Sequence, residues 1–399
     1  NLSRELLFEQ VSKMRVPEPI PAEERITTDP AILVKLKDML VKAENPIIYT
    51  RYLGRNASAV YDLVKLAETL GIPVFEHPGY MNFPTDNSLH MGTSFAPYQG
   101  DIDLILIIDS SSWPPWYPPN SIRDKTKAKI VFMDPDPIQH KYPVYSYPAE
   151  MRIRADTSIA IRQLNRLLSL EKLNEDKIKE RTTRWTKEHS KIREKQRKRA
   201  LSVMDAYPID PVWLCYCIDE VINEGTAIVN ETITHGRLIH SYIESNRVRP
   251  GTRFEATGPI AHTGLGQGMG VALGVKLANP EKTVIALEGD GTFNYNPVLA
   301  AFGAAQEYQL PFLTIIYNNS CYAAMKGHAR YYPDGHSVTQ NDYYGVGCGP
   351  TPHYAKLIEA FDGHSETVED PSEVKRALLD ALKATRNGQV SLLDVRLSR

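Results

Sequence analysis

The stretch TVIALEGDGTFNYNPVLAAFGAAQEYQLPFLTIIYNNSCY, residues 283–322, decides the fold of this chain. Residues 283–287 and 312–317 are apolar and rich in β-branched and aromatic side chains, which predicts two buried parallel strands. Between them, residues 297–309 are rich in alanine and have one apolar face, and Pro297 lies near their start, which predicts a crossover helix. The stretch therefore predicts one βαβ unit.

Polar residues follow both predicted strands, as GDG at residues 289–291 and as NN at residues 318–319. A right-handed crossover brings both strand ends to the same edge of the sheet, where α/β proteins bind ligands. The carboxylate of Asp290 and the amide oxygen of Asn319 suit an Mg²⁺ ion that is also held by phosphates. The two glycines beside Asp290 let backbone N–H groups approach a phosphate closely.

Together, these two motifs resemble the fingerprint of the thiamine diphosphate (ThDP)-dependent enzymes, the superfamily of 2-oxo acid decarboxylases and acetolactate synthases. An ordinary glycine turn with a polar strand cap is the alternative interpretation. The resemblance covers nearly the whole chain, but its specific motifs lie between residues 230 and 323. It implies ThDP and Mg²⁺ as cofactors. It also implies a carbon–carbon lyase or carboligase for a 2-oxo acid or a related 2-hydroxyacyl substrate, working through a C2 ylid and an enamine of the cofactor.

The resemblance further implies roles for individual residues. The metal ligands would be Asp290, Asn319 and the backbone carbonyl of Cys321. The residues around the cofactor would be Thr234, His235, Thr263, Leu265, Gly289, Gly291, Thr292, Tyr322 and Ala323. Leu265 would be the apolar wedge beneath the bent cofactor. Two alternatives stay open, namely simple helix N-capping by Thr234 and close helix–sheet packing by the glycine-rich residues 263–270.

Alternating strand and helix patterns predict an α/β fold with two doubly wound parallel-sheet domains. We expect a central domain at residues 29–168, a charged helical linker at 169–208 and a ThDP pyrophosphate-binding domain at 209–399. Residues 1–28 resemble the end of the family's first, pyrimidine-binding domain followed by a proline-rich linker; a natural N-terminal arm is the alternative. In the family the glutamate that activates the cofactor lies in that first domain, so no catalytic side chain is predicted here.

The family places its cofactor between this domain and the pyrimidine-binding domain of a partner subunit. We therefore expect that domain to come from another chain or from a preceding part of this one, in a homo- or hetero-oligomer, a dimer or tetramer. A non-catalytic scaffold or regulatory subunit is the alternative function.

Several segments leave their role open. The aromatic loop at residues 113–117 is expected either near the substrate or at a surface or interface. His90 is expected to be a satisfied polar residue. A separate group of side chains would bind a carboxylate or a CoA phosphate, or face water: Lys326, His328, Arg330 and Tyr331. The central domain lacks G-x-G-x-x-G, and its only nucleotide hints are Gly54 and the pair Asp134 and Asp136, so we expect no cofactor there.

Composition narrows the class of protein. The chain has 399 residues, 42% of them hydrophobic, and a net charge of −2, which favours a soluble globular protein with a small-molecule substrate and no nucleic-acid or membrane partner. The basic residues 172–199 predict a solvated connector helix, with nucleic-acid contact as the alternative. Four cysteines form no disulfide framework, Cys215 and Cys217 are expected in the core, and a reducing cytoplasm is the expected location.

Overall fold

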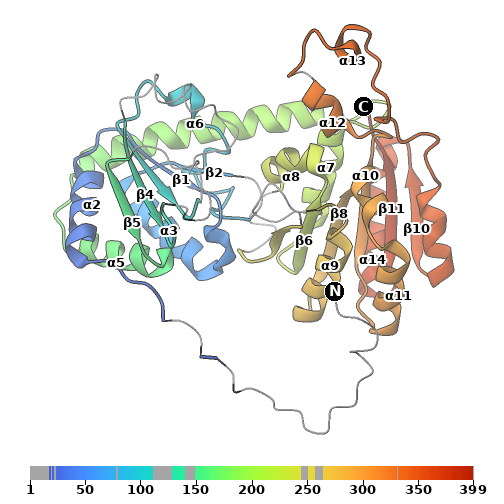
Figure 1. Cartoon of the computed structure of the whole chain (residues 1–399), viewed down its shortest axis with the longest axis horizontal. Coiled ribbons are helices and arrows are strands. Elements are labelled where there is room, and N and C mark those ends of the chain that lie inside the picture. Colours follow the sequence, from blue (N-terminus) through green and yellow to red (C-terminus); the bar gives the residue numbers. More distant parts are fainter. Residues whose placement is uncertain are drawn as a thin grey trace.

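The computed structural model describes residues 18, 20–21, 24–77, 80–110, 128–138, 140, 149–243, 250–256, 264–329 and 331–398. Within these ranges the chain forms two α/β units, and every strand pair is parallel (Figure 1). The predicted fold class is therefore confirmed.

The central unit is a five-stranded sheet with the order β2-β1-β3-β4-β5. Its strands are β1 (Pro46–Thr50), β2 (Val74–Glu76), β3 (Leu104–Ile108), β4 (Lys129–Asp134) and β5 (Met151–Arg154). Its helices are α2 (Pro30–Lys42), α3 (Ala57–Leu70) and α5 (Thr157–Ser169), with single turns η1 (Leu53–Arg55) and η2 (Ala96–Tyr98). Helix α2 has a regular start, because Asp29 accepts a hydrogen bond from the N–H of Ala31 and Pro30 is the first helical residue.

Helix α6 (Glu175–Leu201) connects the two units and runs along one side of both (Figure 1). The prediction that this segment is solvated is wrong for one of its faces. Trp185 is buried in the core of the central unit, and the guanidinium of Arg181 donates hydrogen bonds to the carbonyls of residues 43, 44 and 70. His189, one turn further on, donates from Nδ1 to the carbonyl of His90 (2.7 Å). The buried stripe has helical spacing, but two of its three residues are polar, so an apolar count misses it.

The C-terminal unit is a six-stranded sheet with the order β10-β11-β9-β8-β6-β7. Its strands are β6 (Thr226–Glu231), β7 (Arg253–Glu255), β8 (Thr283–Gly289), β9 (Leu313–Asn318), β10 (His364–Val368) and β11 (Ser391–Arg396). Its longer helices are α7 (Pro211–Val221), α9 (Gly268–Ala278), α11 (Val298–Glu307) and α14 (Val374–Arg386). The short helices and turns are η4 (Ile233–His235), α8 (Gly236–Tyr242), α10 (Asp290–Tyr295), α12 (Ala323–Ala329), α13 (His336–Thr339), η5 (Tyr354–Phe361) and η6 (Pro371–Glu373).

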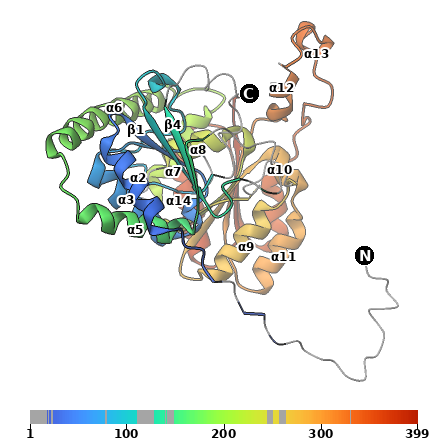
Figure 2. The ribbon, with the colours of Figure 1, turned by 60° about the vertical axis from the view of Figure 1, so that its left-hand side comes forward.

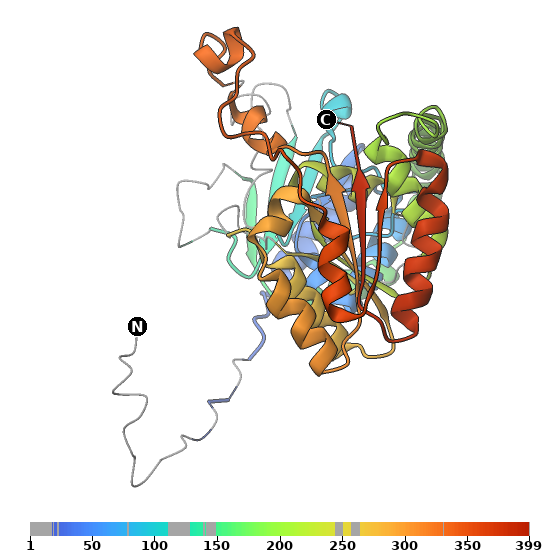
Figure 3. The same ribbon diagram turned by 90° about the vertical axis from the view of Figure 1, so that its right-hand side faces the viewer.

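Helices cover both faces of this second sheet (Figure 3). One core cluster joins the sheet to α7, α8 and α14, and includes Cys215 and Cys217 as predicted. The other joins it to α9, α11 and η5. Because both faces are buried, the central strands are continuous apolar runs, which explains why they were recognisable in the sequence.

The predicted βαβ unit is confirmed, with one correction. The crossover contains two helices instead of one, because Asp290 itself opens α10, and α11 begins only at Val298, after Pro297. Helix α10 has six residues, too few to show a helical period in the sequence.

Helices α12 and α13 lie on an arm that projects beyond the body of the C-terminal unit (Figure 2). The arm exposes several large side chains, among them Met325, Tyr331, Tyr332 and Tyr344. Among the described helices, none combines the length and apolar character that a membrane span requires.

Candidate cofactor and metal site

The site predicted from the sequence lies at the carboxyl edge of three adjacent strands, β6, β8 and β9. From β6 the chain first adds β7 on one side and then adds β8 on the other, so the strand order reverses between β6 and β8. A crevice forms outside the strand ends at such a reversal, and open α/β sheets bind ligands there.

The structure brings the side chains of Asp290 and Asn319 together. Oδ2 of Asp290 and Oδ1 of Asn319 both accept the backbone N–H of Cys321, at 3.2 and 3.0 Å. Both residues are buried, and burial raises the pKa of Asp290 above its ordinary value. The edge therefore presents two converging oxygen ligands, and the buried carboxylate is short of a positive partner.

The backbone groups that follow are bonded within the chain. The carbonyl of Cys321 accepts the N–H of Ala323 (2.9 Å), and the N–H of Tyr322 donates to the carbonyl of Val346 (2.8 Å). The carbonyl of Cys321, which was predicted to bind the metal, is thus hydrogen-bonded within the protein. The same holds for the N–H groups of Tyr322 and Ala323, which were predicted to lie near the cofactor. Cofactor binding in the predicted manner requires this segment to exchange these bonds for bonds to the ligand.

The residues around Asp290 are tightly packed. A Cβ atom on Gly291 would lie 2.7 Å from the ring of Tyr322, whereas one on Gly289 would meet only ordinary contacts of 3.4 Å or more. The hydroxyl of Thr292 faces inward, with the carbonyl of Glu231 at 2.8 Å and Oε2 of Glu288 at 3.0 Å. Its predicted contact with a cofactor would therefore have to come from its backbone.

The loop of residues 264–268, which we call the Leu265 loop, lies beside this edge and leads into α9. Leu265 is 44% exposed despite its apolar side chain. Gly266 has φ +87°, and a Cβ there would lie 2.3 Å from the carbonyl oxygen of Tyr295. A Cβ on Gly268 would lie 2.0 Å from Oε1 of Glu288, so close packing does account for part of the glycine-rich pattern.

Two buried glutamates beneath the Leu265 loop were not assigned a role from the sequence. Glu231 ends β6 and accepts the N–H groups of residues 266, 267 and 268 at 2.9, 3.1 and 2.8 Å. Burial and the neighbouring charge of Glu231 raise the pKa of Glu288 well above its usual range. In the sequence, the only sign of their role is that both glutamates lie at the carboxyl ends of apolar strands.

Thr234 and His235 lie at the end of β6. Thr234 is exposed and makes no side-chain capping bond to η4 or α8, so the N-capping alternative is wrong. His235 is buried beside Tyr317, with ring centroids 5.4 Å apart, and burial lowers its pKa to about 4. Its Nδ1 has no hydrogen-bond partner within the described residues. At neutral pH His235 thus offers an uncharged N–H donor and no positive charge.

The remaining predicted positions are either exposed or outside the described residues. Lys326, His328 and Tyr331 are exposed on the arm, where Nζ of Lys326 lies 4.9 Å from the ring of Tyr343. Thr263, Arg330 and the aromatic loop at residues 113–117 lie outside the described residues.

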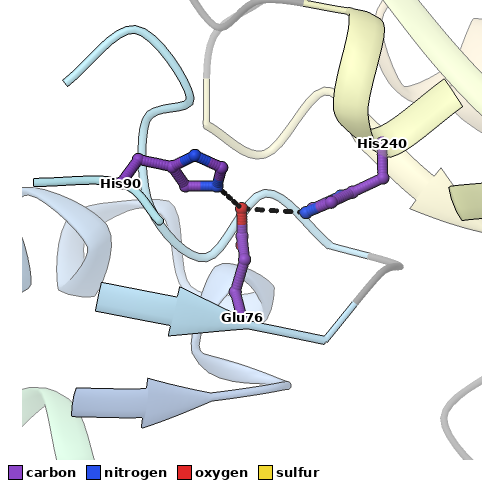
Figure 4. Close-up of side chains that lie close together, drawn as sticks. All are labelled: Glu76, His90 and His240. Atoms are coloured by element: carbon purple, nitrogen blue, oxygen red, sulfur yellow. Dashed lines mark hydrogen bonds and ion pairs between the residues drawn. The ribbon is translucent and has the colours of Figure 1, made fainter. Parts of the chain in front are cut away.

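A second cluster of titratable side chains, Glu76, His90 and His240, lies where the two units meet (Figure 4). Oε1 of Glu76, at the end of β2, is 2.9 Å from Nε2 of His90 and 3.0 Å from Nε2 of His240 on α8. Oε2 of Glu76 accepts the backbone and side-chain N–H groups of Asn82. His90 is therefore a satisfied polar residue, as predicted.

This cluster resembles a metal site in its residue types, but the surroundings of His240 do not fit those of a metal ligand. Nδ1 of His240 is 3.3 Å from Nη1 of Arg253, and a guanidinium can only donate. The proton of His240 is then on Nε2, the atom that faces Glu76. A metal-ligating histidine instead donates its other N–H to an acceptor. We therefore interpret the cluster, within the described residues, as a carboxylate held between two imidazoles.

The nucleotide hints in the central unit have local explanations. A Cβ on Gly54 would lie 2.4 Å from the carbonyl oxygen of Met81, so packing requires this glycine. Oδ1 of Asp134 accepts the N–H of Asp136 (2.7 Å) in a local turn. A cavity of about 330 Å³ does open at this edge, lined by Arg55, Asp109 and the start of α5 among others.

Comparison with known proteins points to the same family as the motifs. Residues 234–395 match the family model "Thiamine pyrophosphate enzyme, C-terminal TPP binding domain". The chain is 26% identical over 374 residues to a probable acetolactate synthase large subunit of Methanocaldococcus jannaschii, covering 88% of this chain and 58% of that protein. It is 25% identical over 400 residues to a 2-hydroxyacyl-CoA lyase of Arabidopsis thaliana, covering 97% and 65%. It spans less than two thirds of the length of these relatives.

Solved structures show the same fold. A thiamine diphosphate-dependent 4-hydroxybenzoylformate decarboxylase of Rhodococcus jostii superposes with a TM-score of 0.73 at 20% identity, covering 96% of this chain and 66% of that one. A benzoylformate decarboxylase of Polynucleobacter necessarius gives the same TM-score and identity, with 98% and 68% covered. The motifs, the domain match over residues 234–395 and the shared fold together support a relationship of this chain to the superfamily of thiamine diphosphate-dependent enzymes.

Proposed function

We propose that this chain binds the diphosphate and metal ion of ThDP in an enzyme that breaks or forms a carbon–carbon bond next to a carbonyl. The observation that supports it most strongly is the convergence of Asp290 and Asn319 on one backbone N–H at the ends of β8 and β9. Hard oxygen ligands beside a strand-end crevice fit a magnesium ion that also binds phosphate oxygens.

The donor set fits the ion in charge as well as in geometry. The buried carboxylate of Asp290 has a raised pKa because burial is not offset by a cationic side chain. A divalent ion would supply the missing charge, and the carbonyl of Cys321 would complete the protein ligands once released from the N–H of Ala323.

The other residues of this edge would position the cofactor. His235 would donate one neutral N–H, and Leu265 would present an apolar surface to the rings. When bound, ThDP supplies a nucleophilic carbon and an electron sink, while the protein supplies orientation and electrostatics.

The substrate class we propose is a 2-oxo acid or a related 2-hydroxyacyl compound. The acetolactate synthase, lyase and decarboxylase activities in the relatives' names share this chemistry. We further propose that a pyrimidine-binding domain, from a partner chain or a longer form of this one, completes the site in an oligomer. The four cysteines are all free of disulfides, which supports a reducing, cytoplasmic location.

The metal assignment is tested by Asp290→Asn, which keeps the shape of the side chain and removes its charge. Isothermal titration with ThDP and Mg²⁺ should show an affinity about 100-fold lower, or about 2.7 kcal/mol. Asp334→Asn is the matched control, because Asp334 is exposed on the projecting arm. Equal affinities for the wild type and Asp290→Asn would contradict the assignment.

The activity is tested by a product screen with 2-oxo acids and 2-hydroxyacyl-CoA thioesters, given ThDP, Mg²⁺ and the completed assembly. We expect cleavage or ligation in at least one class. Cofactor binding without any carbon–carbon chemistry would instead support the non-catalytic scaffold.

A further inference from the structure

The Leu265 loop is held from below by a single carboxylate. Both oxygens of Glu231 are used: Oε1 accepts the N–H groups of Gly266 and Gln267, and Oε2 accepts that of Gly268. The acceptor is separated from these donors by 35 to 37 residues, so the bonds tie the loop to the end of β6. Bonds from backbone N–H groups to a charged carboxylate are among the stronger hydrogen bonds in proteins.

Asn296 extends this tie to the helix that begins with Asp290. Its Nδ2 donates to Oε2 of Glu231 (3.0 Å), and its Oδ1 accepts the N–H of Met269 (3.1 Å). The carbonyl of Thr292, in α10, also accepts Nδ2 of Asn296 (2.9 Å). Glu231 and Asn296 are buried, so water does not compete for these bonds.

Leu265, in contrast, is 44% exposed, so packing covers only part of it. Its height above the sheet edge therefore depends on its backbone, and the N–H groups that follow it in the loop are held by Glu231. This arrangement requires glycine at position 268, because a Cβ there would lie 2.9 Å from Oε2 of Glu231.

We propose that Glu231 is a positioning residue that sets the Leu265 loop at the height needed to support the rings of bound ThDP. This inference rests on the proposed function, because it requires that ThDP binds at this edge. Glu231, a buried acid at the end of β6, would thus help to select the ring portion of the cofactor. The edge around Asp290 would bind the diphosphate separately.

The test uses two ligands that share the diphosphate but differ in the rings. The completed assembly is titrated with ThDP and with inorganic pyrophosphate, each with Mg²⁺, with this chain as wild type and as Glu231→Gln. Glutamine keeps the size of the side chain, but its NH2 group is a donor. It would face N–H groups of the loop or of Asn296 to which the glutamate offered an acceptor. We expect ThDP affinity to fall roughly 10- to 100-fold, the range for losing a charged hydrogen bond, while pyrophosphate affinity is unchanged.

Two further variants separate positioning from general damage. Glu255→Gln is the matched control, because it makes the same change on neighbouring β7, where Glu255 accepts a bond from Asn230. The control should match the wild type with both ligands. Leu265→Ala should lose ThDP affinity selectively, and adding Glu231→Gln to it should cause little further loss, because both act through the same side chain.

A cofactor-free readout checks the structural half of the inference. Hydrogen exchange of the amides at residues 266–268 should be at least about tenfold faster in Glu231→Gln than in wild type, since a protecting acceptor is lost. If Glu231→Gln does not fold, Glu231→Asp, which retracts the carboxylate by one methylene, should show the same selectivity.

Each result has a definite meaning. Equal losses for ThDP and pyrophosphate, no loss for either, or unchanged exchange would overturn the positioning role. A wild type that binds pyrophosphate but shows no additional affinity for ThDP would overturn the proposed function, and this inference with it. Normal ThDP binding by wild type and Glu231→Gln alike would overturn the inference alone.

Discussion

Gly266 shows how a single residue constrains the site. Its φ of +87° lies in the left-handed region, and a Cβ would lie 2.3 Å from the carbonyl oxygen of Tyr295. A Cβ on Gly264, two residues earlier in the same loop, would have no atom of the described residues within 4 Å. The two glycines look alike in the sequence, but only one is required by the backbone.

We therefore predict different costs for the same substitution at these two positions. Gly266→Ala should lower the free energy of unfolding by about 1–3 kcal/mol, because it adds both backbone strain and a clash. Gly264→Ala should change it by no more than about 0.5 kcal/mol. Urea unfolding followed by fluorescence measures both. Similar values for the two variants would show that the conformation of the Leu265 loop differs from the one described here.

Residues of the site differed in how well the sequence revealed them. Asp290 and Asn319 could be predicted because each follows an apolar strand within one βαβ unit, and the topology of that unit fixes where they meet. Glu231 and Glu288 also end apolar strands, but their partners are set by the path of a loop that no local pattern specifies. A buried carboxyl pair has no sequence signature of its own.

At the scale of elements, α6 shows why composition alone is a poor guide to burial. Its mean composition is strongly charged, but Arg181, Trp185 and His189 form one buried stripe. The ring of Trp185 lies 5.1 Å from that of Tyr98 and 6.5 Å from that of Phe75. This helix is therefore part of the central unit's core and not merely a tether.

Trp185→Ala should accordingly destabilise the protein by about 3–5 kcal/mol, the usual cost of removing a buried aromatic ring. Lys187→Ala, an exposed change on the same helix, should have an effect within about 0.5 kcal/mol. Thermal or urea unfolding would distinguish them. A small effect of Trp185→Ala would mean that α6 is only loosely attached to the central unit.

Short edge elements were the hardest to predict. Strand β7 has three residues, and four of the five residues of β10 are only partly buried, so neither shows the apolar run of the inner strands. Helix α10 is likewise shorter than the window in which periodicity is visible. By contrast, α3 and α7 carry clear sequence signals, since each has a polar N-cap and a regular pattern of buried positions.

At the scale of the whole molecule, the cluster of Glu76, His90 and His240 links the two units. It combines a strand end of the central sheet with a helix of the C-terminal unit (Figure 4). Burial alone would raise the pKa of Glu76, but His240 and His90 outweigh it and hold this pKa well below its ordinary value of 4.5. Such a group stabilises the fold fully above the unfolded-state pKa and loses its contribution as the pH falls below it.

Glu76→Gln should therefore cost about 1.5–3 kcal/mol at pH 7, the range for losing hydrogen bonds to a buried charged group. The difference from wild type should shrink as the pH falls from about 5 to 3, because the wild-type carboxylate is then protonated on unfolding. Glu366→Gln is the control, since its pairing with Arg376 is half-exposed and should be worth no more than about 1 kcal/mol. A Glu76→Gln cost that is independent of pH would argue against an ionised Glu76.

The account depends most on a divalent ion that joins the ends of β8 and β9 to the diphosphate of ThDP. A crystal structure of the chain grown with ThDP and Mn²⁺, using the anomalous signal of manganese, tests this directly. We predict one peak within about 2.3 Å of the side-chain oxygens of Asp290 and Asn319, with the diphosphate on its open side. A manganese peak elsewhere, or a diphosphate bound away from this edge, would contradict the account.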